Sequence, residues 1–264
     1  MSAFPRLLAL ALLLAGCDAP DAGALDSAAL ENIAVAPQPG HCRTQIFEGD
    51  SFTVCPFDAA RDELRLALEG ADGLPLRSLP ALHESLGKQA DRVRFAMNAG
   101  MYDEEGRPVG LFVADGKEHK PLNLRTGPGN FHLLPNGVFA VDGKGAVSVQ
   151  TSQAYATRIS PAAWATQSGP MLVIDGKLHP KFDENGPSQL VRNGVGVKDP
   201  STAFFVISEA GVSFGRFARF FRDALGCPNA LFLDGSVSSL WDPKAERQDT
   251  YPNLGPMVVV LEKE

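Results

Sequence analysis

Short apolar runs, separated by glycine, proline and aspartate breaks, make up most of the chain after residue 41. Segments 44–47, 52–55 and 63–68 alternate or cluster apolar residues between such breaks, which is typical of β-strands. The third segment has leucine at every second position, so one face of this strand is expected to be buried. The pattern in this part of the chain therefore predicts sheet rather than helix.

The strand pattern continues to the end of the chain. Turn signals at Asp115-Gly116 and Pro135-Asn136-Gly137 predict two hairpins, the second of which joins segments 130–134 and 137–141. A third hairpin is expected to pair segments 192–197 and 204–207. Further strands are predicted over 93–98, 111–113, 147–149, 171–174 and 257–261.

Helical signals are few. One segment has a clear helical period, with apolar residues spaced by three and four positions: Phe217, Phe220, Phe221, Ala224 and Leu225. A short helix is also predicted over 79–86, and a helical turn over 151–158.

Capping residues frame both predicted helices. Ser78 is placed to cap the shorter one and Gly87 to end it, while Ser213 or Gly215 begins the longer one and Gly226 ends it. Many strands with few short helices predict an α+β fold class. We expect a single globular domain over 41–264, built from β-rich mixed sheets.

One predicted strand delivers an acidic side chain. Three apolar residues at 231–233 run directly into Asp234, which is followed by Gly235 and Ser236. A continuous apolar run is typical of a strand that is buried on both faces, and polar groups at strand ends are common catalytic positions. The alternative is an Asx turn with no catalytic role. Asn98 ends an earlier strand in a similar way, with a plain asparagine turn as its alternative.

Composition limits the size of the core and the kinds of partner. The 264 residues are 44% hydrophobic, which is enough for one sizeable core. The formal net charge is −7 and no basic stripe is present, which argues against a nucleic-acid partner. Because no spacing of histidine, cysteine and acidic residues resembles a zinc or calcium site, we expect no metal and no other cofactor.

The first 40 residues are expected to be a targeting and anchoring segment rather than part of the folded domain. Arg6 precedes a short apolar run over 7–15, which suits a signal peptide and is too short to span a bilayer. The small residues before Cys17 resemble the lipobox of bacterial lipoproteins, which implies a signal peptide over 1–16 and lipidation of Cys17. The alternative is an ordinary signal peptide with a chance cysteine.

The segment 17–40 is rich in alanine, proline, glycine and aspartate and is expected to be a flexible tether. The domain would then be lipid-anchored in the bacterial cell envelope and face the periplasm or the exterior. Asp18 resembles a signal for retention in the inner membrane.

Three cysteines remain in the predicted domain. Cys42 and Cys55 lie at equal distances from the turn Glu48-Gly49-Asp50, so a hairpin centred there sets them opposite each other. We predict a disulfide between them in the oxidising envelope. Cys227 is left free and is expected to be buried just after the longer helix.

Four short glycine-rich motifs follow one another in an informative order. They are Asn98-Ala99-Gly100, Ser168-Gly169-Pro170 with Asp175-Gly176, Arg192-Asn193-Gly194-Val195-Gly196, and Asp234-Gly235 with Ser238. In this order they resemble the phosphodiester glycosidase family, relatives of the uncovering enzyme that removes N-acetylglucosamine from a sugar phosphodiester. The resemblance extends from about residue 95 to the C-terminus and is closest to small secreted bacterial members.

The resemblance implies hydrolysis of a sugar-1-phosphodiester bond. Asp234 would act at the anomeric carbon as nucleophile, charge stabiliser or base. Arg192 is expected to meet two phosphate oxygens with its planar fork, and Asn98 to hydrogen-bond a sugar hydroxyl or the phosphate. The residues expected to bind substrate are Ser168, Gly169, Asn193, Gly194, Gly235, Ser236, His132 and Tyr102.

Some of these assignments have plain structural alternatives. A histidine beside an aromatic residue, as at His132, is more often structural than catalytic, and Tyr102 suits the core as well as a sugar platform. The family often has glycine where Ala99, Ser236 and Val237 stand, so the loops here have less backbone freedom.

Three functions are therefore considered. The first is a hydrolase of sugar-1-phosphodiester bonds in envelope or exported polysaccharide. The main alternative is a non-catalytic envelope lipoprotein that binds anionic glycans, and the third is a metal-dependent phosphodiesterase. We expect a monomer with a lipid anchor in the membrane, whose partner is a glycan or a sugar-phosphodiester substrate.

Overall fold

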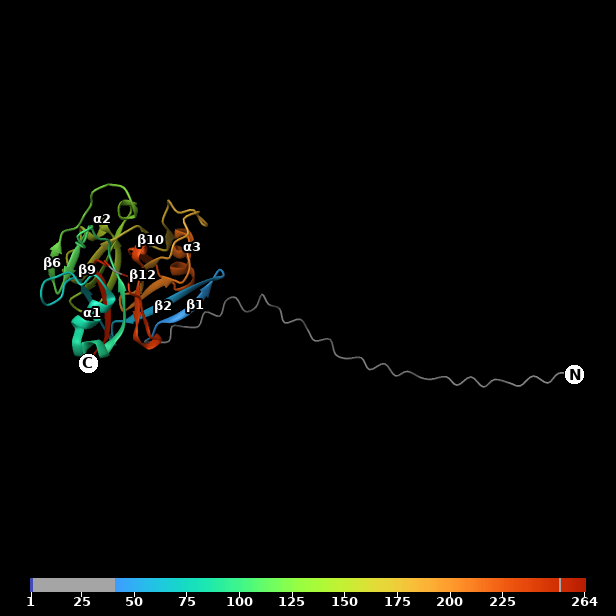
Figure 1. The fold of residues 1–264 in the computed structure, drawn as a ribbon. Helices are drawn as coiled ribbons and strands as arrows, with labels where there is room; N and C mark the ends of the chain where they lie inside the picture. Colours follow the sequence, from blue (N-terminus) through green and yellow to red (C-terminus); the bar gives the residue numbers. More distant parts are fainter. Residues whose placement is uncertain (2–40, 252) are drawn as a thin grey trace. The chain divides into compact units, whose positions relative to one another are not determined.

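The computed structural model describes Met1, residues 41–251 and residues 253–264 (Figure 1). The predicted signal peptide, Cys17 and the predicted tether lie outside the described residues. Among the described residues, no helix combines the length and apolarity needed to cross a membrane.

The described strands form three sheets. The first contains β1 (Arg43–Phe47), β2 (Asp50–Asp58), β13 (Thr202–Ser208), β12 (Asn193–Asp199), β14 (Asn229–Phe232), β10 (Met171–Ile174) and β11 (Lys177–Leu178), in this order. The second contains β16 (Arg247–Gln248), β15 (Leu240–Asp242), β4 (Val93–Asn98), β17 (Met257–Glu262) and β3 (Asp62–Ala67). The third contains β6 (Lys117–Lys120), β5 (Phe112–Ala114), β9 (Ala162–Ser168), β7 (Gly137–Asp142) and β8 (Val147–Thr151).

The predicted α+β, β-rich fold class is confirmed, with the refinement that the described strands pair antiparallel throughout. The three sheets share one central core, because each sends apolar side chains into the same buried cluster. Phe205 of the first sheet illustrates this arrangement. Its ring centroid lies 5.4 Å from that of Phe95 in the second sheet and 5.5 Å from that of Phe139 in the third.

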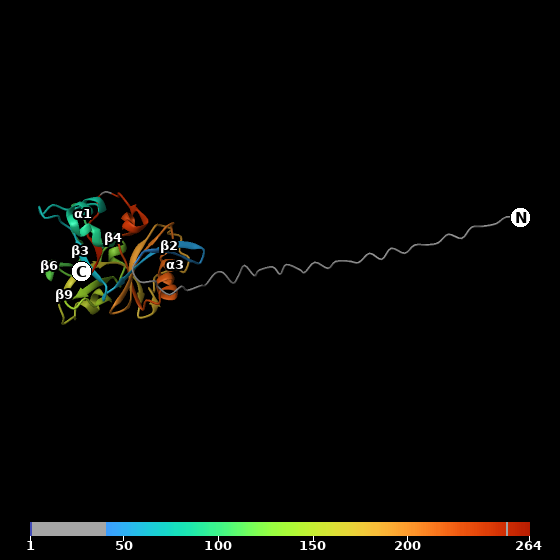
Figure 2. The same cartoon turned by 90° about the horizontal axis from the view of Figure 1, so that it is seen from below.

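A helix covers the outer face of each described sheet. Helix α3 (Phe214–Arg219) and the π-helical turn η4 (Phe220–Ala224) pack on the first sheet, and α1 (Leu79–Leu86) packs on the second. The short helix α2 (Ser152–Tyr155) lies beside the third, where Tyr155 packs against the apolar face. Figure 2 shows α3 close to β2, well away from α1. This packing explains why β13 is apolar at successive positions rather than at alternate ones.

Helix limits follow the predicted caps. The hydroxyl of Ser78 accepts a hydrogen bond from Ala81 N at 3.2 Å, and that of Ser213 accepts one from Arg216 N at 3.1 Å. Gly87 and Gly226 follow the two helical segments with φ angles of +52° and +66°, which favour glycine.

The predicted hairpin between 130–134 and 137–141 is wrong. Residues Asn130–His132 form the short 3-10 helix η3, and β7 pairs with β8 and β9 instead. The carbonyl of Phe131 accepts a hydrogen bond from Asn136 Nδ2 at 2.8 Å, so a side chain takes the place of a strand partner. Strand β9, which the sequence pattern did not reveal, occupies the neighbouring position in the sheet.

The predicted disulfide is confirmed. Cys42 and Cys55 are bonded across the β1–β2 hairpin with their Cα atoms 4.0 Å apart. Cys227 is free and buried, also as predicted, and burial raises the pKa of its thiol to about 12.

Removal of the disulfide is expected to lower stability without changing the fold. The bridge closes a segment of 13 residues, and cross-links of this span restrict the unfolded chain enough to contribute about 3 kcal/mol. The double variant Cys42→Ala/Cys55→Ala should therefore unfold at lower urea concentration. Wild-type protein in reducing agent is the matched control and should unfold at the same concentration. A loss well under 1 kcal/mol would show that the hairpin is held by its packing alone.

Candidate active site

Asp234 lies just after β14, which runs between β12 and β10 in the middle of its sheet. The carboxylate is half-buried and caps the short 3-10 helix η5 (Gly235–Val237), accepting a hydrogen bond from Ser236 N at 3.2 Å. The predicted Asx turn is thus present, and it holds the carboxylate in a fixed position. No arginine or lysine of the described chain forms an ion pair with Asp234.

The pKa of Asp234 is raised above its ordinary value because burial disfavours the charged form, and the single N–H of Ser236 offsets this only in part. A raised pKa on a carboxylate at a strand end is characteristic of groups that exchange protons or stabilise charge.

Asn98 holds the backbone at Asp234 and at Ser239. Its side chain is buried, and Nδ2 donates to the Asp234 carbonyl at 2.7 Å, while Oδ1 accepts from Asn193 Nδ2 and from Ser239 N, both at 2.9 Å. The amide of Asp234 also donates to the carbonyl of Ala99 at 3.1 Å. Asn98 is therefore a positioning residue in this geometry, and only its second Nδ2–H is left for the predicted contact with substrate.

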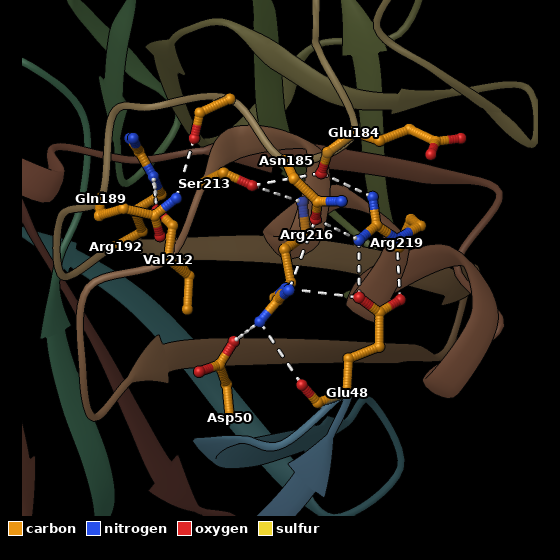
Figure 3. Close-up of polar contacts among 11 residues, drawn as sticks. Glu48, Asp50, Glu184, Asn185, Gln189, Arg192, Val212, Ser213, Arg216 and Arg219 are labelled. Atoms are coloured by element: carbon orange, nitrogen blue, oxygen red, sulfur yellow. Dashed lines mark hydrogen bonds and ion pairs between the residues drawn. The ribbon is translucent and has the colours of Figure 1, made fainter.

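Arg192 is buried just before β12, and its side chain is hydrogen-bonded to protein oxygens (Figure 3). Its Nε donates to Val212 O at 2.8 Å, and its Nη2 donates to the carbonyl and the hydroxyl of Ser188 at 3.0 and 3.1 Å. The guanidinium carbon lies 3.6 Å from the ring centroid of Phe214 and 5.6 Å from that of Phe232. Burial lowers the pKa of Arg192 to about 10, which still leaves it charged at neutral pH.

The expected two-point grip of Arg192 on a phosphate needs correction. The edge formed by Nε and Nη2 is occupied by protein oxygens, so only Nη1 lacks a hydrogen-bond partner among the described residues. Figure 3 shows Glu184 and Asn185, a few residues before Ser188, beside α3, where Arg219 Nη1 donates to Glu184 O at 2.7 Å. Arg219 is itself paired with Glu48, whose side chain lies 2.6 Å away.

The other predicted motifs come together around Asp234. A Cβ on Gly100 would lie 2.6 Å from Gln167 O, and Phe232 N donates to Pro170 O at 3.1 Å. Gly194 is paired with Phe232 across β12 and β14. The structure therefore brings together four segments that are distant in the chain: 98–100, 168–170, 192–194 and 232–235.

Glycine is required at several positions in these segments. A Cβ on Gly194 would lie 2.8 Å from Leu231 O, and one on Gly235 would lie 2.6 Å from the ring of Phe232. Gly169 is similarly crowded, since a Cβ there would lie 2.6 Å from Asn136 Cβ. These contacts leave no room for a side chain at any of the three positions.

The remaining predicted binding residues differ in their surroundings. Ser168 is fully buried, and its hydroxyl has no hydrogen-bond partner among the described residues, whereas Ser236 is exposed. His132 is half-buried and its Nδ1 lies 2.9 Å from Arg125 O. Tyr102 is half-buried, and its pKa is raised to about 12, first by burial and then by the charge of Asp234. The side chain of Tyr102 is therefore close enough to Asp234 for the carboxylate charge to affect its titration.

Two site residues were not found from the sequence. Ser239 supplies an N–H to Asn98, and Arg77 lies over the ring of Tyr102 with its guanidinium carbon 5.9 Å from the centroid. Neither belongs to one of the four motifs, so only proximity in space identifies them. Within the described part of the chain, no group of three or more histidine, cysteine or acidic side chains is arranged to hold a metal ion.

Comparison with known proteins gives consistent matches. Residues 91–252 match the family described as phosphodiester glycosidase. The uncharacterized protein YigE of Escherichia coli (strain K12) is 34% identical over 191 residues, which make up 72% of this chain and 73% of YigE.

Two solved structures share the fold. The catalytic domain of zebrafish N-acetylglucosamine-1-phosphodiester alpha-N-acetylglucosaminidase, auto-inhibited by its pro-peptide, matches with a TM-score of 0.58 at 13% identity, covering 84% of this chain and 82% of that chain. A putative exported protein from Burkholderia pseudomallei matches with a TM-score of 0.53 at 13% identity, covering 86% and 75% of the two chains. At these identities the two structures establish the fold alone.

Proposed function

The chain belongs to the phosphodiester glycosidase family, and from this premise we propose that it hydrolyses a sugar-1-phosphodiester bond in envelope or exported polysaccharide. The observation that carries the proposal is the carboxylate of Asp234. It is half-buried and has a raised pKa. The residue that carries it is held through its backbone carbonyl by the buried side chain of Asn98, where all four motifs meet.

The proposed reaction breaks the bond between the anomeric carbon and the phosphate oxygen. Water supplies the new oxygen on the sugar, and the phosphate leaves as a monoester with the electron pair of the broken bond. Ionised Asp234 acts at the anomeric carbon as nucleophile or charge stabiliser, or removes the proton from the attacking water. Because a phosphate monoester is a good leaving group, the reaction does not require a second carboxylic acid next to Asp234.

Binding of the anionic diester requires positive charge near Asp234. Arg192 supports this part of the proposal through its charge and through Nη1, although its Nε and Nη2 are bonded to protein oxygens. The unpartnered hydroxyl of Ser168 is a further candidate donor.

The predicted lipid anchor at Cys17 would hold the domain at the cell envelope. A tethered hydrolase would then meet polysaccharide at or outside the membrane, where sugar phosphodiesters link glycan units. The absence of a basic surface stripe fits a glycan partner rather than nucleic acid.

The test is a product analysis with a methyl diester of N-acetylglucosamine 1-phosphate in water enriched in ¹⁸O. We expect free N-acetylglucosamine and methyl phosphate, with no ¹⁸O in the methyl phosphate, because water attacks carbon rather than phosphorus. Release of N-acetylglucosamine 1-phosphate, or ¹⁸O in a phosphate product, would instead show a phosphodiesterase.

A second sugar series keeps the test independent of sugar identity. The same methyl diesters of glucose, galactose and mannose 1-phosphate are assayed in parallel. Saturable binding of these diesters without any turnover would overturn the hydrolase proposal and favour the non-catalytic glycan-binding lipoprotein.

A further inference from the structure

A pocket of ≈ 480 Å³ lies beside the Asp234 site. It is of a size that suits a small ligand. Its lining comes from four separate parts of the chain and combines aromatic, amide and charged side chains: Arg77, Tyr102, Glu104, Val237, Tyr251 and Asn253. This set, called the Tyr102 pocket below, offers aromatic rings and hydrogen-bonding groups together, which is the chemistry that a sugar ring requires.

The Tyr102 pocket contains the positive charge of Arg77, which forms no ion pair with the neighbouring Glu104. No acidic side chain of the described residues forms an ion pair with Arg77, and its Nη1 is buried without a hydrogen-bond partner among them. Its Nη2 makes one long contact, 3.5 Å, to Asn253 Oδ1. Nη1 is closed off against Gly106, so an anionic ligand in the pocket would meet the rest of the guanidinium. There it would supply a stronger acceptor than the one long contact to Asn253.

Two glycines make room for the side chains of Arg77 and Tyr102. A Cβ on Gly106 would lie 1.7 Å from Arg77 Nη1, and a Cβ on Gly255 would lie 2.3 Å from the Tyr102 ring. Each of these two side chains therefore packs directly against a glycine. Arg77 also has a φ angle of +63°, which non-glycine residues rarely adopt and which is often found at functional sites.

The pocket adjoins the proposed catalytic group. Val237, which lines it, ends the 3-10 helix that Asp234 caps. The charge of Asp234 also contributes to the raised pKa of Tyr102, which keeps the phenol protonated and able to donate a hydrogen bond. A ligand seated in the pocket would thus lie next to the bond that Asp234 attacks.

We propose that the Tyr102 pocket is a subsite for a sugar unit that bears an acidic group, with the ring against Tyr102 and Tyr251 and the acidic group on Arg77. This inference rests on the proposed function in one respect only, which is that the bond to be broken lies at Asp234. The acidic group could be the carboxylate of a uronic acid or a phosphate on the sugar. Both have oxygen pairs that match a guanidinium.

The test measures binding by calorimetry with three probes: methyl glucoside, methyl glucuronoside and methyl glucoside 6-phosphate. None contains a glycosyl phosphodiester bond, so the result is independent of turnover at Asp234. We expect at least one acidic probe to bind about tenfold more tightly than the neutral one, since hydrogen bonds to charged groups are of this strength. Comparison of the two acidic probes distinguishes carboxylate from phosphate.

Three variants locate the effect. Arg77→Gln should remove the preference, so that the acidic and neutral probes bind alike, and a urea unfolding curve matched to the wild type shows that the variant is folded. Glu104→Gln should tighten binding of the acidic probe alone, because Glu104 brings a negative charge to the same pocket. Arg61→Gln is the matched control, because exposed Arg61 lies at the opposite end of the second sheet.

Two outcomes would overturn the proposal. One is equal binding of the neutral and acidic probes, or no binding of any probe, to the wild-type protein. The other is an acidic preference that survives in Arg77→Gln. Neither result bears on hydrolysis at Asp234. Likewise, a protein that fails to hydrolyse the diesters could still show the binding preference, so the two proposals are tested separately.

Discussion

Replacement of Asp234 with asparagine is expected to lower kcat for a sugar-1-phosphodiester by about 10²- to 10⁴-fold, the range typical of a lost catalytic acid or base. The substitution keeps the size of the side chain and the hydrogen bond from Ser236 N, so the backbone around residue 234 should be unchanged. The measurement is the steady-state rate of sugar release. A higher KM with an unchanged kcat would contradict a role for the carboxylate in the reaction.

The chain offers a matched control for this variant. Asp175-Gly176 follows β10 in the same way as Asp234-Gly235 follows β14, but Asp175 lies opposite Asn229, at the other end of β14. Asp175→Asn makes the same chemical change at a second strand end. Its activity should equal that of the wild type.

The same Asp234 variant should also be more stable than the wild type at neutral pH. The folded-state pKa of Asp234 lies above its unfolded value, so the folded state binds more protons in the interval between the two. Its contribution to the free energy of unfolding therefore falls as pH rises through that interval. Asparagine does not ionise and escapes this loss. Urea unfolding at acid and neutral pH checks the sign, and equal stability of the two proteins at neutral pH would contradict the raised pKa.

Replacement of Asn98 with alanine is expected to lower both stability and turnover. The change leaves Ser239 N and the carbonyl of Asp234 without their partner and removes one acceptor from Asn193 Nδ2. Buried groups without partners each cost about 1–3 kcal/mol, so the loss of stability should be about 3 kcal/mol. Because Asp234 would no longer be held in place, turnover should fall about 100-fold. Both are measured on the same preparation, by urea unfolding and sugar release.

Lower stability by itself could reduce activity, so a second destabilised variant is needed. Leu82→Ala removes a buried side chain of helix α1, which packs on the outer face of the second sheet. It should cost about 2–5 kcal/mol and leave turnover unchanged at temperatures where the protein is folded. If Leu82→Ala loses activity as severely as Asn98→Ala, the positioning role of Asn98 is not supported.

Much of the fold can be predicted from the sequence because its local signals agree with its packing. The caps at Ser78 and Ser213 and the hairpin that joins Cys42 to Cys55 are set by residues close together in the chain. The segment 130–134 could not be predicted in this way. Its conformation depends on a hydrogen bond from the side chain of Asn136 and on a neighbouring strand, β9, that lacks a clear apolar period.

The candidate site was predictable to a similar degree. Residue types and their order indicated Asp234, Asn98 and Arg192, and the structure brings their segments together. Their surroundings were not predictable, since the burial of Arg192 against Phe214 and Ser188 arises from chain segments with no common motif. Arg77 could not be predicted for the same reason, because it lies far from Tyr102 in the sequence and contacts it only in the folded chain.

The position of β17 has a consequence for the order in which the molecule matures. This strand follows every other described strand in the chain, yet it lies between β4 and β3, and Met257 is the partner of Asn98. Pairings between distant segments form slowly and late. A chain whose last residues are still inside the ribosome therefore lacks the strand that completes the second sheet and pairs with Asn98. The surroundings of Asp234, whose carbonyl Asn98 holds, are accordingly completed last.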